Sequence, residues 1–365
     1  MSGFESIWSG EREAALPWRV LLGIASSGYR VGRSLHRALY DFGIARRHRF
    51  PVPVVSVGNL AVGGCGKTPF VAWLAAELTG RGKRVMVLGR GYGRPAGAAL
   101  NDEGEWLAAR LPRVAVVQAP DRFRAALAEM ARTPVDLVLL DDGFQHEPLE
   151  RDLDIVLLDA RAPFGNGRLL PAGPLRESPS ALARAHFLFV TRAELVAPAT
   201  LEAVSTRLVR AAPRATVGTV RFEIGALRCG DNRHPPAWLA GRKIVLATGV
   251  GSPSSVRATA ERLGAVVCDH VVFPDHHSFT AGDLAEAQAR ASRHGAVLVV
   301  TEKDAIKLAR LEASVVAASS EEAPLVVLEQ VPTVTAGGEA LLHAVLALPL
   351  RQDAPAPISP VASSR

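Results

Sequence analysis

The sequence of 365 residues predicts an α/β protein with doubly wound domains, in which helices cover both faces of a mostly parallel sheet. Three observations lead to this fold class. From residue 52 onward, short apolar runs alternate with segments of helical periodicity. The runs are β-branched and nearly unbroken, as in strands buried on both faces of a parallel sheet. A glycine-rich turn joins the first run to the first helix, which indicates a phosphate-binding domain.

Length and composition fit a protein of two domains rather than one. Apolar residues make up 48% of the chain and charged residues 21%, an ordinary globular balance. Lys and Arg exceed Asp and Glu by 42 − 36 = 6, which suits phosphates or anionic lipid, and we expect no nucleic-acid partner. Cys65, Cys229 and Cys268 are widely spaced and form no metal or disulfide pattern, so we expect a reducing compartment.

Residues 1–50 are expected to form a basic amphipathic helical region packed on the first domain. Residues 14–40 contain no Asp or Glu, while Arg30, Arg33 and Arg37 share one helical face opposite apolar residues such as Leu21. Such a helix lies in a membrane interface or packs on its own domain, and the pattern alone leaves both open. We see no run of apolar residues long enough to span a bilayer, and acidic residues near the start argue against a signal peptide.

The first domain is expected at residues 51–215. Its predicted strands are 52–58, 84–89, 114–118, 135–142, 153–160 and 186–192. Its predicted helices are 67–78, 121–132 and 198–211.

Glycine and proline residues interrupt the next stretch, so residues 216–240 are expected to be an irregular linker. A smaller C-terminal α/β domain follows at 241–335, then a closing helix at 336–350 and a disordered tail at 351–365. The strands predicted in the smaller domain are 243–251, 264–273, 296–301 and 324–329, and its predicted helices are 254–263 and 281–293.

The turn "GNLAVGGCGKTP" (58–69) is read as a phosphate loop. It departs from the strict pattern, which has glycine where this chain has Ala61. Backbone N–H groups of the loop and the start of the next helix suit phosphate oxygens. Lys67 is predicted to reach the β- and γ-phosphates and Thr68 to bind Mg²⁺. The predicted nucleotide-binding residues are Gly63, Gly64, Cys65, Gly66, Lys67, Thr68 and Pro69.

The run "LVLLDDGFQH" (137–146) is an apolar strand that ends in two acids, Asp141 and Asp142. An acid at this place is the expected partner of a phosphate loop, because it lies next to the Mg²⁺. Successive side chains of a strand point in opposite directions, so at most one of the two is expected to face the metal. The sequence leaves open which one.

Three further segments carry polar residues in loops: "GRGYGR" (89–94), "GRLLPAGPLRE" (167–177) and "FPDHHSF" (273–279). The histidines of the last segment suit a general base or a group that orients one. They lack other ligands at metal-binding spacing, and a solvated loop is the alternative reading.

Together these segments resemble the tetraacyldisaccharide 4′-kinase family, roughly from Pro17 to the final helix. The matching pieces stand in one order: "VGNLAVGGCGKTP", "GRGYGR", "NDEGEWLA", "DRF", "LLDDGFQH", "NGRLLPAGPLRE", "FPDHHSF" and "TEKDAIK". The resemblance implies two phosphate-loop-like α/β domains and a kinase that moves the γ-phosphate of ATP, with Mg²⁺, to the 4′-hydroxyl of a lipid-linked glucosamine disaccharide 1-phosphate. It also implies a peripheral protein at the cytoplasmic face of the inner membrane.

The resemblance further implies roles for particular residues. Asp102 matches the catalytic carboxylate, and His276 of the second domain matches the histidine that supports it, with Lys67 as the third catalytic group. The positions that match the lining of the family's substrate site are Tyr92, Arg122, His146, Arg176 and Glu177. Around Asp102 the chain departs from the family's usual Gly-Asp-Glu-Pro, and without the resemblance this acid reads as surface charge.

Two other functions fit part of the sequence. "TEKD" (301–304) is similar to the guanine-reading motif of GTPases, which allows a nucleotide-switch protein, although its first residue is not Asn. Another small-molecule kinase or ligase with a phosphate loop would not need the basic N-terminal helix. Competition between guanine and adenine nucleotides, and partition into vesicles, separate these alternatives.

Overall fold

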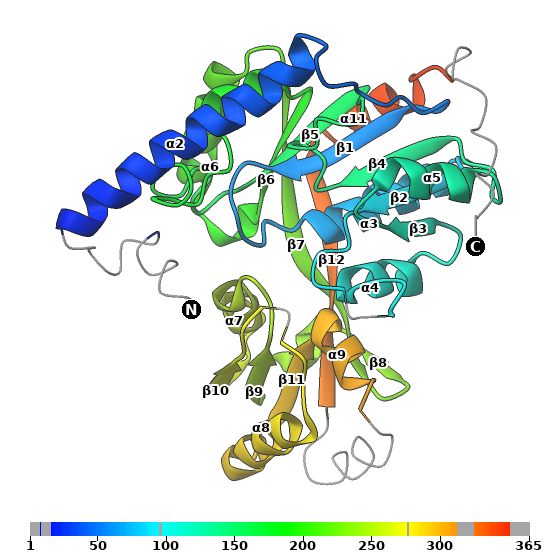
Figure 1. The fold of residues 1–365 in the computed structure, drawn as a ribbon. Helices are drawn as coiled ribbons and strands as arrows, with labels where there is room; N and C mark the ends of the chain where they lie inside the picture. Colours follow the sequence, from blue (N-terminus) through cyan, green and yellow to red (C-terminus); the bar gives the residue numbers. More distant parts are fainter. Residues whose placement is uncertain (1–7, 9–15, 95–96, 276, 312–324, 351–365) are drawn as a thin grey trace. The chain divides into compact units, whose positions relative to one another are not determined.

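The computed structural model describes residues 8, 16–94, 97–275, 277–311 and 325–350 (Figure 1). These residues form two compact units. Unit 1 takes in the described residues up to Tyr92, those from Leu107 to Val220 and those from Val334 on. Unit 2 takes in the described residues from Gly93 to Trp106 and from Arg221 to Thr333.

Unit 1 has a sheet with seven parallel strands between Val54 and Val220. Its strands are β1 (Val54–Asn59), β2 (Val85–Gly89), β3 (Ala115–Gln118), β4 (Leu137–Asp141), β5 (Leu153–Asp159), β6 (Phe187–Thr191) and β7 (Thr216–Cys229) up to Val220. They lie in the order β7-β6-β5-β1-β4-β2-β3. β1 therefore has β4 on one side and β5 on the other, where the direction of winding reverses, and ligands of doubly wound sheets bind at the carboxyl ends of strands at such a point.

Helices of unit 1 follow from amphipathic or apolar segments between these strands. They are α2 (Leu16–Asp41), α3 (Lys67–Gly80), α5 (Arg122–Met130), α6 (Pro198–Ala211) and α11 (Gly338–Leu346), with the 3₁₀ turns η1 (Pro179–Arg184) and η2 (Ala193–Leu195). α3 is apolar on most sides because it packs on β1, β2 and β4 and also contacts α11. Phe70 of α3 is fully buried, with its ring centroid 5.1 Å from that of Phe189 on β6.

Unit 2 has a smaller parallel sheet in the order β10-β9-β11-β12. Its strands are β8 (Asn232–His234), which pairs antiparallel with β7, β9 (Lys243–Thr248), β10 (Val266–Val272), β11 (Val297–Thr301) and β12 (Leu325–Ala336) up to Thr333. Its helical segments are α4 (Asp102–Arg110) up to Trp106, α7 (Pro253–Arg262), α8 (Ala281–His294), α9 (Glu302–Leu308) and η3 (Pro236–Leu239). The strand order and parallel pairing confirm the predicted α/β class.

Two expectations about chain organisation were wrong. The supposed irregular linker at 216–240 begins with the 14-residue strand β7, in which Gly218, Val220, Phe222 and Ile224 are buried in alternation. Alternation marks a half-buried strand, but the glycines within it favoured an irregular connection. Within the range 51–215, the described residues from Gly93 to Trp106 group with unit 2. The predicted tail at 351–365 lies outside the described residues.

Candidate functional site

The phosphate loop of unit 1 connects β1 to α3, as predicted. Gly63 has φ 115° and Gly66 has φ 85°, values in the region that favours glycine, so these two positions let the chain turn sharply. Gly66 is the N-cap of α3, and Lys67, Thr68 and Pro69 form its first turn. The free backbone N–H groups at this helix start, together with its partial positive charge, form an anion-binding end.

The ammonium group of Lys67 is held at the carboxyl ends of β1 and β4. Its Nζ donates to Oδ1 of Asn59 at 3.1 Å and lies 3.5 Å from Oδ1 of Asp142. Burial by itself would lower the pKa of Lys67, but electrostatic interactions with Cys65 and Asp142 outweigh burial, and the pKa is raised. Lys67 therefore stays charged, as a phosphate ligand must.

Asp142 follows β4 with a left-handed backbone, φ 53°, which turns its side chain back toward the loop. Arg176 donates from one guanidinium nitrogen to both carboxylate oxygens, at 2.9 and 2.7 Å. Burial would raise the pKa of Asp142, but the charges of Lys67 and Arg176 prevail and the pKa is lowered. Asp142 is thus an ionised acid already engaged by two cations.

The donors at this edge fit a bound Mg²⁺. Mg²⁺ prefers oxygen ligands, usually one or two carboxylates together with phosphate oxygens and water. The Thr68 hydroxyl and the Asp141 carboxylate are such donors, and Asp142 is committed to Lys67 and Arg176. Among the described residues, His, Cys, Asp and Glu form no cluster of three that could hold a metal ion.

Arg122 begins α5 and is 5% exposed. Its Nε and one terminal nitrogen are buried and donate no hydrogen bond to any described residue. Burial lowers the pKa of Arg122, an effect opposed by Asp142 and Asp141. A buried guanidinium with unsatisfied donors costs free energy unless a ligand supplies acceptors, so this side chain is arranged to receive an anion.

His146 and Tyr92 are the two remaining residues predicted from "DDGFQH" and "GRGYGR". Burial, and then the charges of Arg122, Arg151 and Arg90, lower the pKa of His146 to about 3. His146 is therefore a neutral hydrogen-bonding group at physiological pH. Tyr92, the last residue of "GRGYGR" that belongs to unit 1, is 79% exposed.

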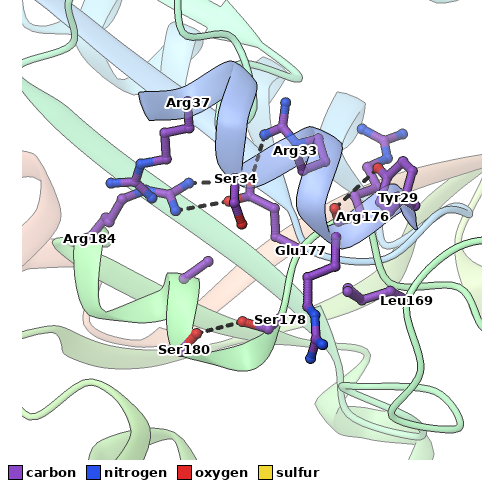
Figure 2. Close-up of a pocket in the computed structure, with 12 residues that line it drawn as sticks. Tyr29, Arg33, Ser34, Arg37, Leu169, Arg176, Glu177, Ser178, Ser180 and Arg184 are labelled. Carbon is purple, nitrogen blue, oxygen red and sulfur yellow. Dashed lines mark hydrogen bonds and ion pairs between the residues drawn. The ribbon is translucent and has the colours of Figure 1, made fainter. Parts of the chain in front are cut away.

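A pocket rich in arginine lies between α2 and the segment from Leu169 to Arg184 (Figure 2). Glu177 is at its centre: Arg33 of α2 lies 3.3 Å from one carboxylate oxygen, and Arg184 of η1 donates to the other at 2.9 Å. Arg30, Arg37 and Arg176 also line the pocket. One acid among five arginines leaves a net positive charge, which suits an anionic group.

α2 reaches this pocket with its polar face. Ser26 donates to the Leu169 carbonyl at 2.9 Å, and the Tyr29 hydroxyl donates to the Arg176 carbonyl at 3.1 Å. The apolar residues of the helix are on the exposed side: Trp18, Val20, Leu21, Ile24, Val31 and Leu35. No helix in the described part of the chain is both long and apolar enough to cross a bilayer.

Asp102 lies in unit 2, at the first position of α4. Its Oδ1 is 2.9 Å from Arg310 and its Oδ2 is 3.6 Å from Lys307 of α9. His276 lies outside the described residues, so the expected Asp–His pair is not observed. Its neighbour Asp275 is 3.5 Å from Lys303, which also binds Glu103 at 3.1 Å. The segments that carry positions 102 and 276 therefore share one cation within unit 2.

The base-reading alternative for "TEKD" (301–304) does not fit the structure. Asp304, which would have to accept from a guanine base, is fully buried. Its carboxylate accepts from the Thr301 hydroxyl at 2.7 Å and from the Gly249 backbone at 3.2 Å. Both bonds tie α9 to the ends of β11 and β9, so this acid is a structural part of unit 2.

Several site residues escaped the sequence analysis. They are Asn59, which receives Lys67, Arg33 and Arg184, which hold Glu177, and Lys303, Lys307 and Arg310, which hold the acids of unit 2. The periodic arginines of α2 and the lysines of "TEKDAIK" were visible in the sequence. Their partners were not, because each is far away along the chain.

Comparison with known proteins adds an independent finding. Residues 18–347 match the LpxK family model, described as tetraacyldisaccharide-1-P 4′-kinase. The chain is 46% identical to a tetraacyldisaccharide 4′-kinase of Anaeromyxobacter dehalogenans (strain 2CP-C), over 84% of this chain and 86% of that relative. It is 43% identical to the protein of that name from Anaeromyxobacter sp. (strain K), over 99% and 100%.

In structure, the chain is similar to the crystal structure of LpxK from Aquifex aeolicus in complex with ATP. The TM-score is 0.68 and the sequence identity 29%, and the match covers 90% of this chain and 98% of that one. The likeness thus extends over both units.

Proposed function

The chain belongs to the tetraacyldisaccharide-1-P 4′-kinase family, and from that premise we propose which residues perform each part of the reaction. It is a kinase of lipid A biosynthesis that transfers the γ-phosphate of ATP to an alcohol group, the 4′-hydroxyl of the disaccharide. In this transfer, the bond between the γ-phosphorus and its bridging oxygen breaks and a bond to the acceptor oxygen forms. The proton of the acceptor hydroxyl has to be taken up by a base.

The phosphate loop and its neighbours bind the donor. Backbone N–H groups from Gly63 to Thr68 surround the phosphates, and Lys67 holds the β- and γ-oxygens. The observation that carries this assignment is the position of the charged Lys67 ammonium, which lies between Asn59 and Asp142 at the carboxyl ends of β1 and β4. Arg122, whose buried donors lack acceptors among the described residues, neutralises charge on the transferring phosphoryl group.

Thr68 and Asp141 would hold the Mg²⁺, which neutralises phosphate charge when it is bound. Asp142 has a role other than metal binding, because Lys67 and Arg176 already pair with its carboxylate. It keeps these two cations in place until phosphate oxygens take over their donors. His146, neutral at physiological pH because its pKa is about 3, donates or accepts a hydrogen bond without adding charge to this cation-rich edge.

Asp102 is the general base. It accepts the proton of the acceptor hydroxyl as the new phosphate ester forms, and His276, as the family resemblance implies, orients it. Lys307 and Arg310 lie on its two oxygens.

The arginine pocket beside Glu177 receives the phosphate that the acceptor already carries. Arginine binds phosphate oxygens through paired N–H donors, and Arg33 and Arg184 present such donors from two sides of the pocket. An incoming phosphate competes with the Glu177 carboxylate for both guanidinium groups. The family is named for a disaccharide 1-phosphate substrate, and the 1-phosphate of such a substrate is an anionic group that these arginines can bind.

The exposed apolar side of α2 rests in the inner-membrane surface at its cytoplasmic face, where both ATP and a lipid substrate can be reached. An interfacial helix buries one apolar face and directs a basic face elsewhere, which is the division that α2 displays. Replacing Leu21 and Ile24 by Ser should reduce co-sedimentation with vesicles that contain anionic lipid. Undiminished co-sedimentation would remove α2 from this role.

The first experiment is an assay with γ-labelled ATP, Mg²⁺ and tetraacyldisaccharide 1-phosphate in detergent. We expect label in the lipid from the wild-type protein and a loss of about 10³-fold or more from Lys67→Ala, because the phosphates lose their main cation. Hydrolysis of ATP without labelled lipid would keep the nucleotide site but contradict the acceptor. Normal transfer by Lys67→Ala would contradict the loop assignment.

A further inference from the structure

The acids and cations around α9 are arranged around Asp102 in a way that the assigned roles do not explain. Lys303, Lys307 and Arg310 follow one another at intervals of four and three residues, the spacing that places side chains on one side of a helix and its following turn. All three pair with acids of residues 102–105 or with Asp275. One short segment therefore supplies the cations for the segment that contains the base.

The two carboxylate oxygens of Asp102 are held by different cations. Arg310 lies 2.9 Å from Oδ1 and Lys307 lies 3.6 Å from Oδ2. A carboxylate gripped at both oxygens cannot rotate freely about its side-chain bonds. This matters at a base, since proton transfer requires the accepting oxygen within hydrogen-bond reach of the hydroxyl.

The Lys307 side chain is itself held in place by buried neighbours. Its side chain is 2% exposed, and its Nζ lies 3.4 Å from the Gly249 carbonyl and 3.9 Å from the Asp304 carboxylate. Asp304 is fully buried and bonded to Thr301 and Gly249. The grip on Oδ2 is thus built into the ends of β9 and β11, whereas the grip on Oδ1 comes from Arg310, whose side chain is 41% exposed.

We infer that Arg310 is a positioning residue for the Asp102 carboxylate and completes, at Oδ1, the grip that the buried Lys307 begins at Oδ2. The inference rests on the proposed role of Asp102 as the base. The Arg310 side chain is 41% exposed, and ion pairs of exposed side chains contribute little to folding. Its effect should therefore appear in turnover.

The test is Arg310→Gln, assayed for lipid phosphorylation at saturating ATP and acceptor. We expect kcat to fall about 10- to 100-fold, because a carboxylate displaced by about 1 Å loses that order of rate, while KM for ATP stays within about twofold. Arg310→Lys, which keeps a cation of shorter reach, should recover part of the loss. Glu105→Gln is the matched control: it removes the other acid that Arg310 binds and should leave kcat unchanged.

A double-mutant cycle distinguishes positioning from a general structural effect. In the Asp102→Asn background, Arg310→Gln should cost less than about twofold further in single-turnover rate, since the carboxylate it positions is gone. Full loss in that background, or a wild-type kcat in Arg310→Gln alone, would overturn the inference while leaving Asp102 as base. Normal turnover by Asp102→Asn alone would instead overturn the proposed base, and the positioning role with it.

Discussion

Each unit contains a lysine beside an aspartate, and the two pairs behave oppositely. In unit 1, Lys67 and Asp142 are 3.5 Å apart, the pKa of the lysine is raised and that of the aspartate is lowered. In unit 2, Lys307 and Asp304 are 3.9 Å apart, and burial, as the largest cause, lowers the pKa of the lysine and raises that of the aspartate. Relative to free side chains, the surroundings stabilise the charged forms of the first pair, whereas burial destabilises the charged forms of the second.

Surrounding charge and burial explain the difference. The Lys67 side chain is 16% exposed, and a second cation, Arg176, supports the charge of Asp142. Asp304 is fully buried, so its charge meets the full cost of leaving water. A pair at a ligand site is therefore kept ionised and ready for phosphate, while a pair in a core joins elements. We therefore expect charge changes in unit 1 to alter nucleotide or acceptor binding, with transfer affected as well at Lys67 and Arg122, and charge changes near α9 to alter turnover alone.

Among the variants that test this difference between the two units, Asp102→Asn is expected to have the largest effect on kcat. It keeps the shape of the side chain and removes the proton acceptor, so kcat should fall about 10²–10⁴-fold. KM for ATP should change by less than about twofold, because the nucleotide ligands belong to unit 1. Steady-state assays with varied ATP measure both, and a large rise in this KM would break the division between binding and turnover.

A smaller loss is expected from Arg122→Gln. A charged hydrogen-bond donor to the phosphate is worth about 1.5–3 kcal/mol, so kcat/KM for ATP should fall about 10- to 150-fold. The melting temperature should stay the same or rise, since a buried cation whose donors lack acceptors among the described residues is removed. If Arg122→Gln lowered the melting temperature but left turnover normal, Arg122 would be a structural residue and not a phosphate ligand.

Weaker still is the effect expected at the arginine pocket. Arg184→Gln should raise KM for the disaccharide phosphate about 3- to 30-fold through the loss of one charged donor, with KM for ATP unchanged. Arg49→Gln serves as control, because it removes a positive charge of unit 1 that pairs with Glu150 and lies outside the pocket lining. If both variants raised the acceptor KM equally, net charge rather than the pocket would be responsible.

The last effect concerns stability against acid. His146 has a pKa of about 3 in the folded chain against an ordinary value of 6.5, so the unfolded chain binds its proton first. Neutral His146 therefore contributes stability above pH 6.5 that is lost as the pH falls from 6.5 toward 3. His146→Asn should reduce the slope of unfolding free energy against pH in this window by up to about 1.4 kcal/mol per pH unit.

Urea unfolding of both proteins at several pH values measures that slope. Identical slopes for wild type and His146→Asn would show that the imidazole titrates normally in the folded state. Burial and the nearby arginines would then have less effect on His146 than its lowered pKa indicates.

The sequence by itself determined the features that depend on neighbouring residues. Buried strands such as β1 and β4 can be predicted, because nearly continuous β-branched runs are typical of strands in a parallel sheet. The phosphate loop can be predicted, because its glycines, Lys67 and Thr68 are neighbours in the sequence at the start of one helix. Even the basic face of α2 follows from residue spacing alone.

Only the tertiary structure decided which distant groups meet. Lys303 and Glu103 are 200 residues apart in the chain, and Arg33 and Glu177 come from separate elements of unit 1. The sequence likewise left Asp141 and Asp142 equivalent, until the left-handed backbone at Asp142 turned it to Lys67 and Arg176. Charge and periodicity are local properties, whereas burial, hydrogen-bond partners and pKa values arise from packing, so the site had to be folded before its chemistry was fixed.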